Sequence, residues 1–363
     1  MPRTPPPDVS LKERLIERIT LDGPMSVADY MHLCLLDPHD GYYTRHVAFG
    51  EDGDFITAPM VSQMFGEMIG VWVAQVWRNM GAPEKFRLVE VGAGRGELMS
   101  DVLRVIDKVP GMRAATEVAF VEPSPVLAAA QADRFDGVHA CARLEDLPTD
   151  TPMILIANEV LDCLPARQFV LSDKGWCERR VGVRDGELVF GLVETPDFAP
   201  PFEVLPGETV EISYEQARFA RQLAEMLKKT TGAALLIDYG RDAAGSGDTL
   251  QALHRHRKSD PLAAPGEHDL TMWADFPVAI DIAIKTGVKH SPVFTQAEFL
   301  TAMGIRARCE VLIRKNPGKS NIIKHQYERL TAPDQMGDLF KVVAMAFPHD
   351  IALPSLEDAS AKD

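Results

Sequence analysis

The stretch Val89-Glu90-Val91-Gly92-Ala93-Gly94-Arg95-Gly96-Glu97 decides the fold. An apolar run over residues 86–91 leads into glycines at every second position, and apolar residues at helical spacing follow from Leu98 to Ile106. Glycines adopt backbone angles that other residues avoid, and the start of a helix offers unpaired N–H groups to a ligand. The stretch therefore predicts a strand, a ligand-binding turn and a helix.

The spacing of the glycines separates two classes of ligand. A dinucleotide-binding turn needs its third glycine one residue later, where this chain has Glu97. A carboxylate there would repel a pyrophosphate, whereas S-adenosylmethionine (SAM) has no phosphate, and its sulfonium and zwitterionic end tolerate carboxylates. Glu122 follows the next apolar run, at 118–121, where a carboxylate can accept hydrogen bonds from both ribose hydroxyls.

We therefore expect SAM as the cofactor. The alternative for the glycine turn is that it only tightens a strand–helix corner, and the alternative for Glu122 is a solvated strand end. The residues expected to bind SAM are Glu90, Gly92, Gly94, Gly96, Glu122 and Asn158.

Short apolar runs alternate with helical stretches along much of the chain. The strand-like runs after the glycine turn cover residues 118–121, 153–157, 233–237 and 341–347. This alternation is typical of a doubly wound α/β sheet of mostly parallel strands, covered on both faces. Helix signals support it: a helix is expected from about Ser62 to Asn79, and Ser10-x-x-Glu13 and Thr295-x-x-Glu298 match the capping-box pattern.

The expected domain organisation has an N-terminal extension and two insertions. Residues 1–80 form a helical extension that covers the cofactor site, residues 81–348 form the SAM-binding domain, and residues 349–363 form a flexible tail. The insertion at about 166–230 contains Asp-Lys-Gly and Asp-Gly turn signals of β-hairpins. The insertion at 239–285 begins with a Gly-, His-, Asp- and Pro-rich stretch, 239–275, expected to be a long loop.

Composition excludes several classes of function. A net charge of −15 disfavours nucleic acid, because phosphate binding usually requires a basic surface. No apolar run is long enough for a membrane-spanning helix, and the first residues show neither a signal-peptide nor a transit-peptide pattern, so we expect a cytoplasmic bacterial protein. The five cysteines include no CxxC pair, and we expect neither disulfides nor a metal site.

A second group of polar residues follows the run at 153–157. Asn158 and Glu159 end that run, and Asp162 comes three residues after Glu159. In open α/β sheets ligands bind beyond the carboxyl ends of the strands, so these side chains are expected to face the methyl donor. Glu159 and Asp162 would share a face if a helix began there; the alternative is an acidic helix start that only interacts with the helix dipole.

Taken together, these motifs resemble those of the mitochondrial complex I assembly-factor methyltransferases and their bacterial MidA-type relatives. The similarity extends over nearly the whole chain, and the motifs occur in the family's order. The matching residues are Asp37-Pro38 with Gly41-Tyr42-Tyr43, Gly53-Asp54-Phe55 with Thr57 and Pro59, Ser62-Gln63 with Phe65-Gly66-Glu67, Glu90 to Gly96, Asn158-Glu159 with Asp162, Leu164-Pro165, Ile237-Asp238-Tyr239-Gly240, Asp260-Pro261, Pro265-Gly266, Asp269-Leu270-Thr271 and Asp275-Phe276.

The resemblance implies a seven-stranded class I methyltransferase fold with added helices and hairpins. It also implies methylation of an arginine in a protein substrate, which in the mitochondrial members is a core subunit of complex I. The chain departs from the family at Val160-Leu161, where a Phe pair is usual, and this change should alter only packing.

Arginine methylation gives the carboxylates a role. The guanidinium is protonated in water and is a poor nucleophile, so a site must hold it with carboxylates and accept its proton. The candidates, in order of preference, are Glu159, Asp162 and Asp238. Tyr42 and Asp54 are expected either to close over the site or to serve ordinary turns.

Histidines and two rival functions complete the predictions. His254, His256 and His268 lack the acidic or cysteine partners of a metal pattern and are interpreted as loop or substrate-facing residues.

One rival function is a non-catalytic SAM-binding assembly chaperone, against which the carboxylates after residue 157 argue. The other is a nicotinamide oxidoreductase, against which Glu97 argues.

Overall fold

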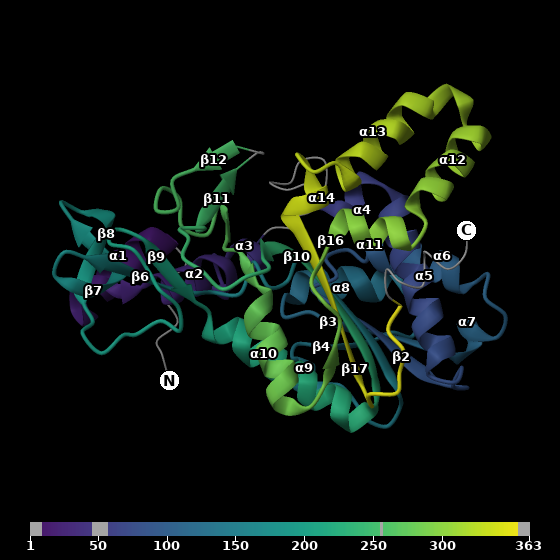
Figure 1. Ribbon diagram of the computed structural model, residues 1–363. Helices are drawn as coiled ribbons and strands as arrows, with labels where there is room; N and C mark the ends of the chain where they lie inside the picture. Colours follow the sequence, from purple (N-terminus) through teal and green to yellow (C-terminus); the bar gives the residue numbers. More distant parts are fainter. Residues whose placement is uncertain (1–8, 46–56, 255–256, 355–363) are drawn as a thin grey trace. The chain divides into compact units, whose positions relative to one another are not determined.

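The computed structural model describes residues 9–45, 57–254 and 257–354 and shows two units, each assembled from segments that are distant in sequence (Figure 1). Unit 1 comprises Met1–Phe55, Asp162–Gln216 and Ala243–Trp273. Unit 2 comprises Ile56–Leu161, Ala217–Asp242 and Ala274–Asp363. The glycine turn and the apolar runs lie in unit 2, so this unit contains the expected cofactor-binding residues. The prediction that the N-terminal extension covers the cofactor site stays a prediction.

A mixed sheet forms the centre of unit 2. Seven strands follow one another in the order β15-β17-β10-β5-β2-β3-β4, and the short strands β14 and β16 are added at β10 and β17. All neighbours among β10, β5, β2, β3 and β4 are parallel, and β17 is antiparallel to both of its path neighbours. The expected seven-stranded, mostly parallel arrangement is confirmed. The strands are β2 (Phe86–Val91), β3 (Thr116–Val121), β4 (His139–Cys141), β5 (Met153–Asn158), β10 (Gly232–Arg241), β14 (Ala274–Asp275), β15 (Lys289–His290), β16 (Phe294–Thr295) and β17 (Phe340–Phe347).

Helices cover this sheet on both faces, as a doubly wound fold requires. Every residue of β2 and of β5 is buried, which explains why apolar residues occur on both faces of these strands rather than on alternate positions. The polar exceptions are Arg87, Glu90 and Asn158. In Figure 1, α9 and α10 lie on one side of the strands and α5 and α6 on the other. The helices are α4 (Ala58–Val61), α5 (Gln63–Asn79), α6 (Glu97–Ile106), α7 (Met112–Ala115), α8 (Pro125–Arg134), η1 (Leu144–Asp146), α9 (Tyr214–Thr230, which begins in unit 1), α10 (Phe276–Thr286), α11 (Gln296–Ala302), α12 (Ile305–Lys315), η2 (Pro317–Lys319), α13 (Ser320–Thr331) and α14 (Met336–Leu339).

Local sequence signals set several helix boundaries. Ser62 accepts a hydrogen bond from Met64 N at the start of α5, and Thr295 and Glu298 form a complete capping box at the start of α11. Both predictions are confirmed. None of the helices in the described ranges combines the length and apolar character needed to cross a bilayer.

Unit 1 combines helices with two antiparallel sheets. One sheet has the order β1-β7-β6-β9 with β8 paired to β7, which confirms the hairpins expected in the first insertion. The other has the order β12-β11-β13. The elements are α1 (Leu11–Asp22), β1 (Met25–Ser26), α2 (Val27–Leu36), α3 (Tyr42–Arg45), β6 (Arg167–Ser172), β7 (Gly175–Arg184), β8 (Glu187–Glu194), β9 (Thr209–Ile212), β11 (Gln251–His254), β12 (Arg257–Ser259) and β13 (Asp269–Thr271).

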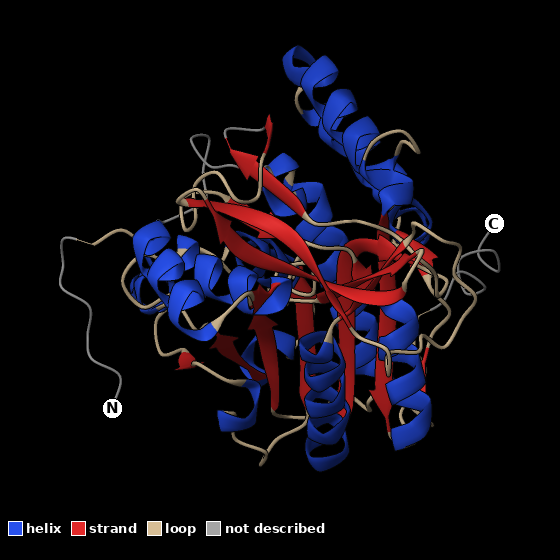
Figure 2. Ribbon diagram, turned by 90° about the vertical axis from the view of Figure 1, so that its left-hand side faces the viewer, coloured by secondary structure: helices blue, strands red, loops and turns tan. Residues whose placement is uncertain are grey.

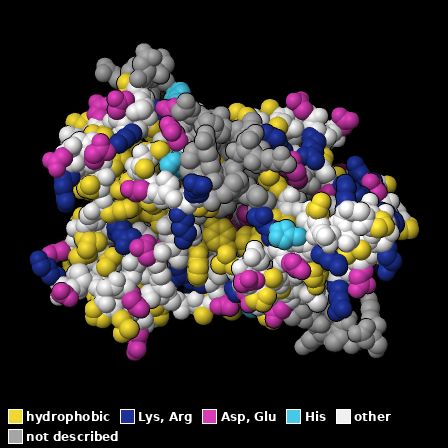
Figure 3. All heavy atoms as spheres, turned by 90° about the horizontal axis from the view of Figure 1, so that it is seen from above, with side chains coloured by type: hydrophobic (Ala, Val, Ile, Leu, Met, Phe, Trp, Pro, Cys, Tyr) yellow, Lys and Arg dark blue, Asp and Glu magenta, His cyan; other side chains and the backbone are white. Residues whose placement is uncertain are grey.

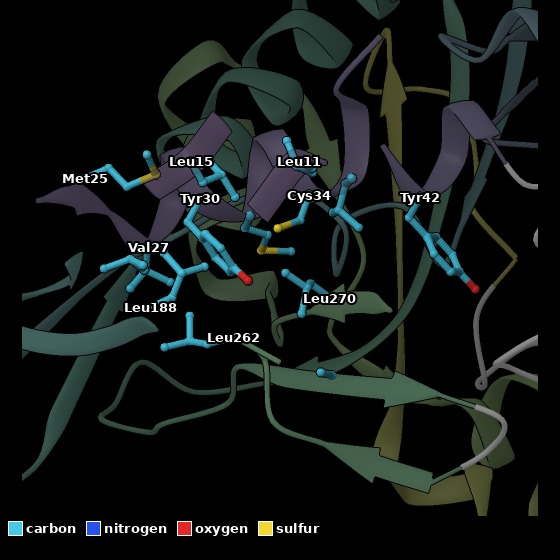
Figure 4. Close-up of a cluster of buried hydrophobic side chains, with 14 of the residues drawn as sticks. Leu11, Leu15, Met25, Val27, Tyr30, Cys34, Tyr42, Leu188, Leu262 and Leu270 are labelled. Carbon is cyan, nitrogen blue, oxygen red and sulfur yellow. The ribbon is translucent and has the colours of Figure 1, made fainter. Parts of the chain in front are cut away.

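A separate hydrophobic core holds unit 1 together (Figure 4). Leu11 and Leu15 of α1 and Tyr30 of α2 meet apolar side chains from the β-strands and from the segment after β12, among them Leu188 and Leu262. The Tyr30 hydroxyl donates a hydrogen bond to Pro261 O at 2.7 Å, so the one polar atom of this ring is paired inside the core. Three segments of the sequence therefore fold around one core.

The segment 239–275 is more ordered than the sequence indicated. Part of it extends β10, and part forms the three-stranded sheet of β11, β12 and β13, instead of one long loop. These strands are three or four residues long. An alternating pattern cannot be recognised over so few positions, and the pairing between strands supplies the order that the sequence does not display.

A buried ion pair connects two helices of unit 2. Arg308 of α12 binds Glu67 of α5 through two hydrogen bonds of 2.6 Å each, and Gln63 also donates to Glu67. The Glu67 side chain is 3% exposed and that of Arg308 is 24% exposed. Because a guanidinium and a carboxylate match in shape, this two-point contact fixes the orientation of α12 on α5.

We expect Glu67→Gln to lower the free energy of unfolding by about 2–4 kcal/mol, because it leaves a largely buried guanidinium without its counter-charge. The control is Asp281→Asn, which breaks the exposed pair of Asp281 with Lys285 and should cost less than about 0.5 kcal/mol. Urea unfolding followed by circular dichroism measures both. Equal effects of the two variants would show that the buried pair does not stabilise this unit.

Candidate active site

The carboxyl ends of four strands meet at one edge of the unit 2 sheet. Val91 at the end of β2 pairs with Val121 of β3 and Ala157 of β5, and Asn158 pairs with Ile237 of β10. Parallel strands in this register all end on the same side. Consequently the residues that follow them, predicted separately from the sequence, lie at a common edge.

The glycine turn has the backbone conformation that its sequence predicts. Gly92, Gly94 and Gly96 have φ angles of +64°, +53° and +79°, all in the left-handed region. A side chain at Gly96 would meet the ring of Phe135. Gly96 N donates to Ala93 O at 2.7 Å, and Gly92 N donates to Val121 O at 3.0 Å. The turn is therefore closed on itself and attached to β3.

Glu122 lies directly after β3 and is 7% exposed. Its Oε1 accepts a hydrogen bond from Ser124 N at 2.9 Å, and its Oε2 accepts one from Gln131 Nε2 at 3.3 Å. Burial raises the pKa of Glu122 to about 7, although both hydrogen bonds favour the ionised form. A carboxylate held in this way at a strand end fits the expected contact with ribose hydroxyls.

Gln131 is a site residue that the sequence analysis missed. It is completely buried on α8, and its Nε2 donates to Gly94 O at 2.8 Å as well as to Glu122. The side chain thus connects the glycine turn to the carboxylate. The available signal was a polar residue four positions after buried Leu127, on the inward face of the predicted helix.

Glu90 is a deeply buried acid at the end of β2. It is 4% exposed, and burial, with a smaller contribution from Glu97, raises its pKa well above the ordinary value for glutamate. Glu97 itself pairs with Arg134 at 2.9 Å, and the same guanidinium donates to Arg95 O. Glu97, the residue that disfavours a dinucleotide, is therefore held beside the glycine turn by Arg134.

Three buried oxygen atoms around the turn have no hydrogen-bond partner among the described residues. They are Glu90 Oε2, Gln131 Oε1 and Asn158 Oδ1. Unpaired buried polar atoms are costly, and their number here is best explained by a ligand that donates hydrogen bonds. SAM has such donors in its amino group, its adenine and its ribose. The residues present therefore fit this cofactor, although each assignment to SAM stays a prediction.

Glu159 adopts a conformation unusual for a residue with a side chain. Its φ is +53°, and its N donates to Ile237 O at 2.9 Å. Its Oε1 accepts hydrogen bonds from Asn158 Nδ2 at 3.0 Å and from Ala58 N, at the start of α4, at 3.1 Å. The carboxylate is therefore fixed at the end of β5 and caps a neighbouring helix. Non-glycine residues in this region are concentrated at functional sites.

Asp238 and Asp162 have different surroundings. Asp238 is fully buried, and its two oxygens accept hydrogen bonds from Leu161 N at 2.8 Å and Tyr239 N at 2.9 Å. It thereby holds the turn after Glu159. Asp162 is buried and belongs to unit 1, where its main-chain oxygen accepts from Met272 N at 2.9 Å.

The helix considered after residue 158 does not form. Residues 159–164 make a turn, because Glu159 has a left-handed backbone conformation and Leu161 N donates a hydrogen bond to Asp238. Glu159 and Asp162 therefore do not share a helical face. Their catalytic roles, like that of Asp238, stay predictions.

The remaining candidates belong to unit 1 or lie outside the described residues. Tyr42 is 4% exposed and belongs to the core of unit 1. His268 is also in unit 1, whereas Asp54, His256 and the side chain of His254 lie outside the described residues. Within the ranges that the structure describes, no group of three or more His, Cys, Asp or Glu side chains could hold a metal ion.

We expect SAM to bind about tenfold more weakly at about pH 6 than at about pH 8. The reason is that Glu122, with a pKa of about 7, must be ionised to accept hydrogen bonds from both ribose hydroxyls, and it is protonated as the pH falls. Isothermal titration of the wild type and of Glu122→Gln measures this effect. The variant should bind more weakly at high pH but lose the pH dependence near 7; parallel profiles would separate SAM binding from this carboxylate.

Comparisons with known proteins agree with this geometry. Residues 68–294 match the family described as "Putative S-adenosyl-L-methionine-dependent methyltransferase". The mitochondrial protein arginine methyltransferase NDUFAF7 homolog of Drosophila melanogaster is 38% identical over 94% of this chain and 86% of its own length. Human mitochondrial protein arginine methyltransferase NDUFAF7 is 32% identical over 94% of this chain and 84% of its own length.

A solved structure shows the same fold. A Burkholderia thailandensis protein crystallised with bound S-adenosyl-homocysteine superposes with a TM-score of 0.83 at 28% identity, over 97% of this chain and 94% of that one. The match covers both units, including the hairpins and the N-terminal helices. The chain therefore belongs to the family of SAM-dependent methyltransferases that includes the mitochondrial NDUFAF7 proteins.

Proposed function

We propose that this enzyme transfers a methyl group from SAM to an arginine of a protein substrate, a subunit of respiratory complex I. The observation that carries the proposal is the 38% identity, over 94% of this chain, with a relative named as a protein arginine methyltransferase. The subunit is suggested by the resemblance of the sequence motifs to those of the complex I assembly factors.

The chemistry of arginine explains what the site must provide. The guanidinium carries its charge at every physiological pH, and its nitrogens are poor nucleophiles while the proton is retained. A carboxylate close to the acceptor nitrogen holds the guanidinium through charge-assisted hydrogen bonds and receives the proton that the nitrogen loses. The proposed enzyme therefore needs at least one fixed carboxylate near the methyl donor.

Glu159 meets this requirement best among the described residues. Ala58 N and Asn158 Nδ2 both donate to its Oε1, so the carboxylate is oriented before any substrate arrives. Asp238 supports it by binding Leu161 N, which fixes the turn that follows. Asp238 is thus a positioning residue in this proposal, and Glu159 is the group that contacts the guanidinium.

The cofactor-binding residues have a separate task. SAM, when bound, supplies an electrophilic methyl group. Glu122 would hold its ribose, and Glu90, Asn158 and the glycine turn would hold its other polar groups, so that the sulfonium is oriented toward the end of β5. Because these residues bind the cofactor and Glu159 contacts the guanidinium, changes at the two places should affect SAM affinity and the rate of methyl transfer separately.

We expect Glu159→Gln to lower the rate of methyl transfer by at least about a hundredfold, because the amide retains the shape but removes the charge that holds and deprotonates guanidinium. SAM affinity should change by less than about threefold, since other residues bind the cofactor. The assay follows labelled methyl transfer from SAM into proteins of a strain lacking this gene, with methylarginine identified by mass spectrometry. Glu145→Gln, an exposed acid of the same unit, is the control.

Other outcomes have defined meanings. A tenfold loss of SAM affinity with turnover intact would make Glu159 a cofactor residue. Full activity with unchanged SAM binding would remove it from the site and leave Asp238 as the leading carboxylate. SAM binding by the wild type without methylation of any protein would favour the assembly-chaperone alternative.

A further inference from the structure

The hairpin formed by α12 and α13 differs in charge from the rest of the chain. Residues 311–327 contain Arg314, Lys315, Lys319 and Lys324 but no Asp or Glu, in a protein whose net charge is −15. We call this segment the basic tip. Over much of the face drawn in Figure 3, Lys and Arg side chains are interspersed with Asp and Glu. A local excess of one sign indicates a surface for a partner of the opposite sign.

The cations of the basic tip are available to a partner. All four side chains are exposed, and none has a carboxylate within ion-pair distance among the described residues. Ile322, which lies between Lys319 and Lys324 in the sequence, is 58% exposed. The tip therefore offers charge together with one apolar contact.

The base of the hairpin is held rigidly. Arg308 of α12 is bound to Glu67 by two hydrogen bonds, and Leu330 O near the end of α13 accepts a hydrogen bond of 2.9 Å from the fully buried Gln296. Both helices are thus anchored to unit 2, and they extend as a helix pair with no strand beside them (Figures 1 and 2). A rigid arm presents its charges without an ordering cost on binding.

The hairpin is also connected to the candidate active site. Helix α13 packs against α4, and the first N–H of α4 donates to the Glu159 carboxylate. All of these residues belong to unit 2. The arm therefore adjoins the helix that positions the proposed catalytic group, which suits a surface that receives the same protein substrate.

We propose that the basic tip is a docking site for an acidic segment of the protein substrate, an inference that rests on the proposed function. A short acidic segment fits better than a nucleic acid or an anionic membrane. Salt at physiological concentration screens the interaction between charges separated by more than roughly 8 Å. A short acidic segment bound at the basic tip therefore interacts mainly with the charges of the tip. An extended polyanion would also approach the strongly acidic remainder of the chain, and one exposed isoleucine provides little area for insertion into a membrane.

The test uses a fluorescein-labelled peptide of Glu-Glu-Leu repeats and fluorescence anisotropy, without SAM. Replacing Arg314, Lys315, Lys319 and Lys324 together by Gln should weaken peptide binding about tenfold or more. The matched control replaces Lys108, Arg113, Lys228 and Lys229, four exposed cations elsewhere in unit 2, by Gln and should retain binding. Unchanged SAM affinity and circular dichroism establish that both variants are folded.

Three results would overturn the proposal. They are equal loss of peptide binding in tip and control variants, tip-dependent binding to phosphatidylglycerol vesicles but not to the peptide, and tip-dependent self-association of the chain in sedimentation. In the methylation assay, the tip variant should raise KM for the protein substrate and leave kcat unchanged. If no arginine is methylated but peptide binding still depends on the tip, the proposed function fails while the docking surface stands.

Discussion

Parallel hydrogen bonding of β5 to both β2 and β10 is the constraint on which the rest of the site depends. It sets Val91 beside Ala157 and Asn158 beside Ile237, so the residues that follow these strands lie at the same edge of the sheet. Pairing of Val91 with Val121 brings the end of β3 to that edge as well. A shift of one residue in any of these ladders would turn the side chains of that strand to the opposite face. The continuous burial of β2 and β5 protects this register, because covering helices pack on both faces.

Placing several acids at one edge has an energetic consequence. Glu90, Glu122 and Asp238 are all less than 8% exposed, and burying carboxylates without compensation is unfavourable. The three carboxylates differ in how many hydrogen bonds offset their burial. Both oxygens of Asp238 accept from main-chain N–H groups, and Glu122 accepts from one main-chain and one side-chain donor. Glu90 keeps one oxygen without a partner among the described residues. The fully paired acid shapes the backbone, whereas the incompletely paired acid is suited to a ligand.

Much of this arrangement could be predicted from the sequence, because it is local. The strand–glycine–helix segment at 86–106, the acid after β3 and the hairpins of the first insertion are encoded by neighbouring residues whose spacing is diagnostic. Capping boxes at Ser10 and Thr295 likewise depend on residues three positions apart. In each case the side chains that specify the structure lie within a few residues of it.

The features that sequence could not provide all depend on contacts between distant segments. Gln131 connects to the glycine turn because α8 brings its Nε2 to 2.8 Å from Gly94 O. Its spacing from Leu127 indicates an inward-facing side chain but not the group that this side chain binds. The chain turns after Asn158 instead of beginning a helix, because Asp238, far along the sequence, binds Leu161 N. The anchoring of α12 depends on Glu67, which precedes Arg308 by 241 residues. The division into two units, each built from separated segments, arises in the same way.

At residue 159 the backbone and the side chain make opposite demands. A φ of +53° suits glycine and costs other residues about 1 kcal/mol, yet the Glu159 side chain accepts a hydrogen bond from Ala58 N, which a glycine could not do. A glycine there would relieve the backbone while removing the carboxylate. If Glu159 has the proposed role, stability and activity conflict at this position, and efforts to make this protein more heat-resistant by relaxing strained residues should leave it unchanged.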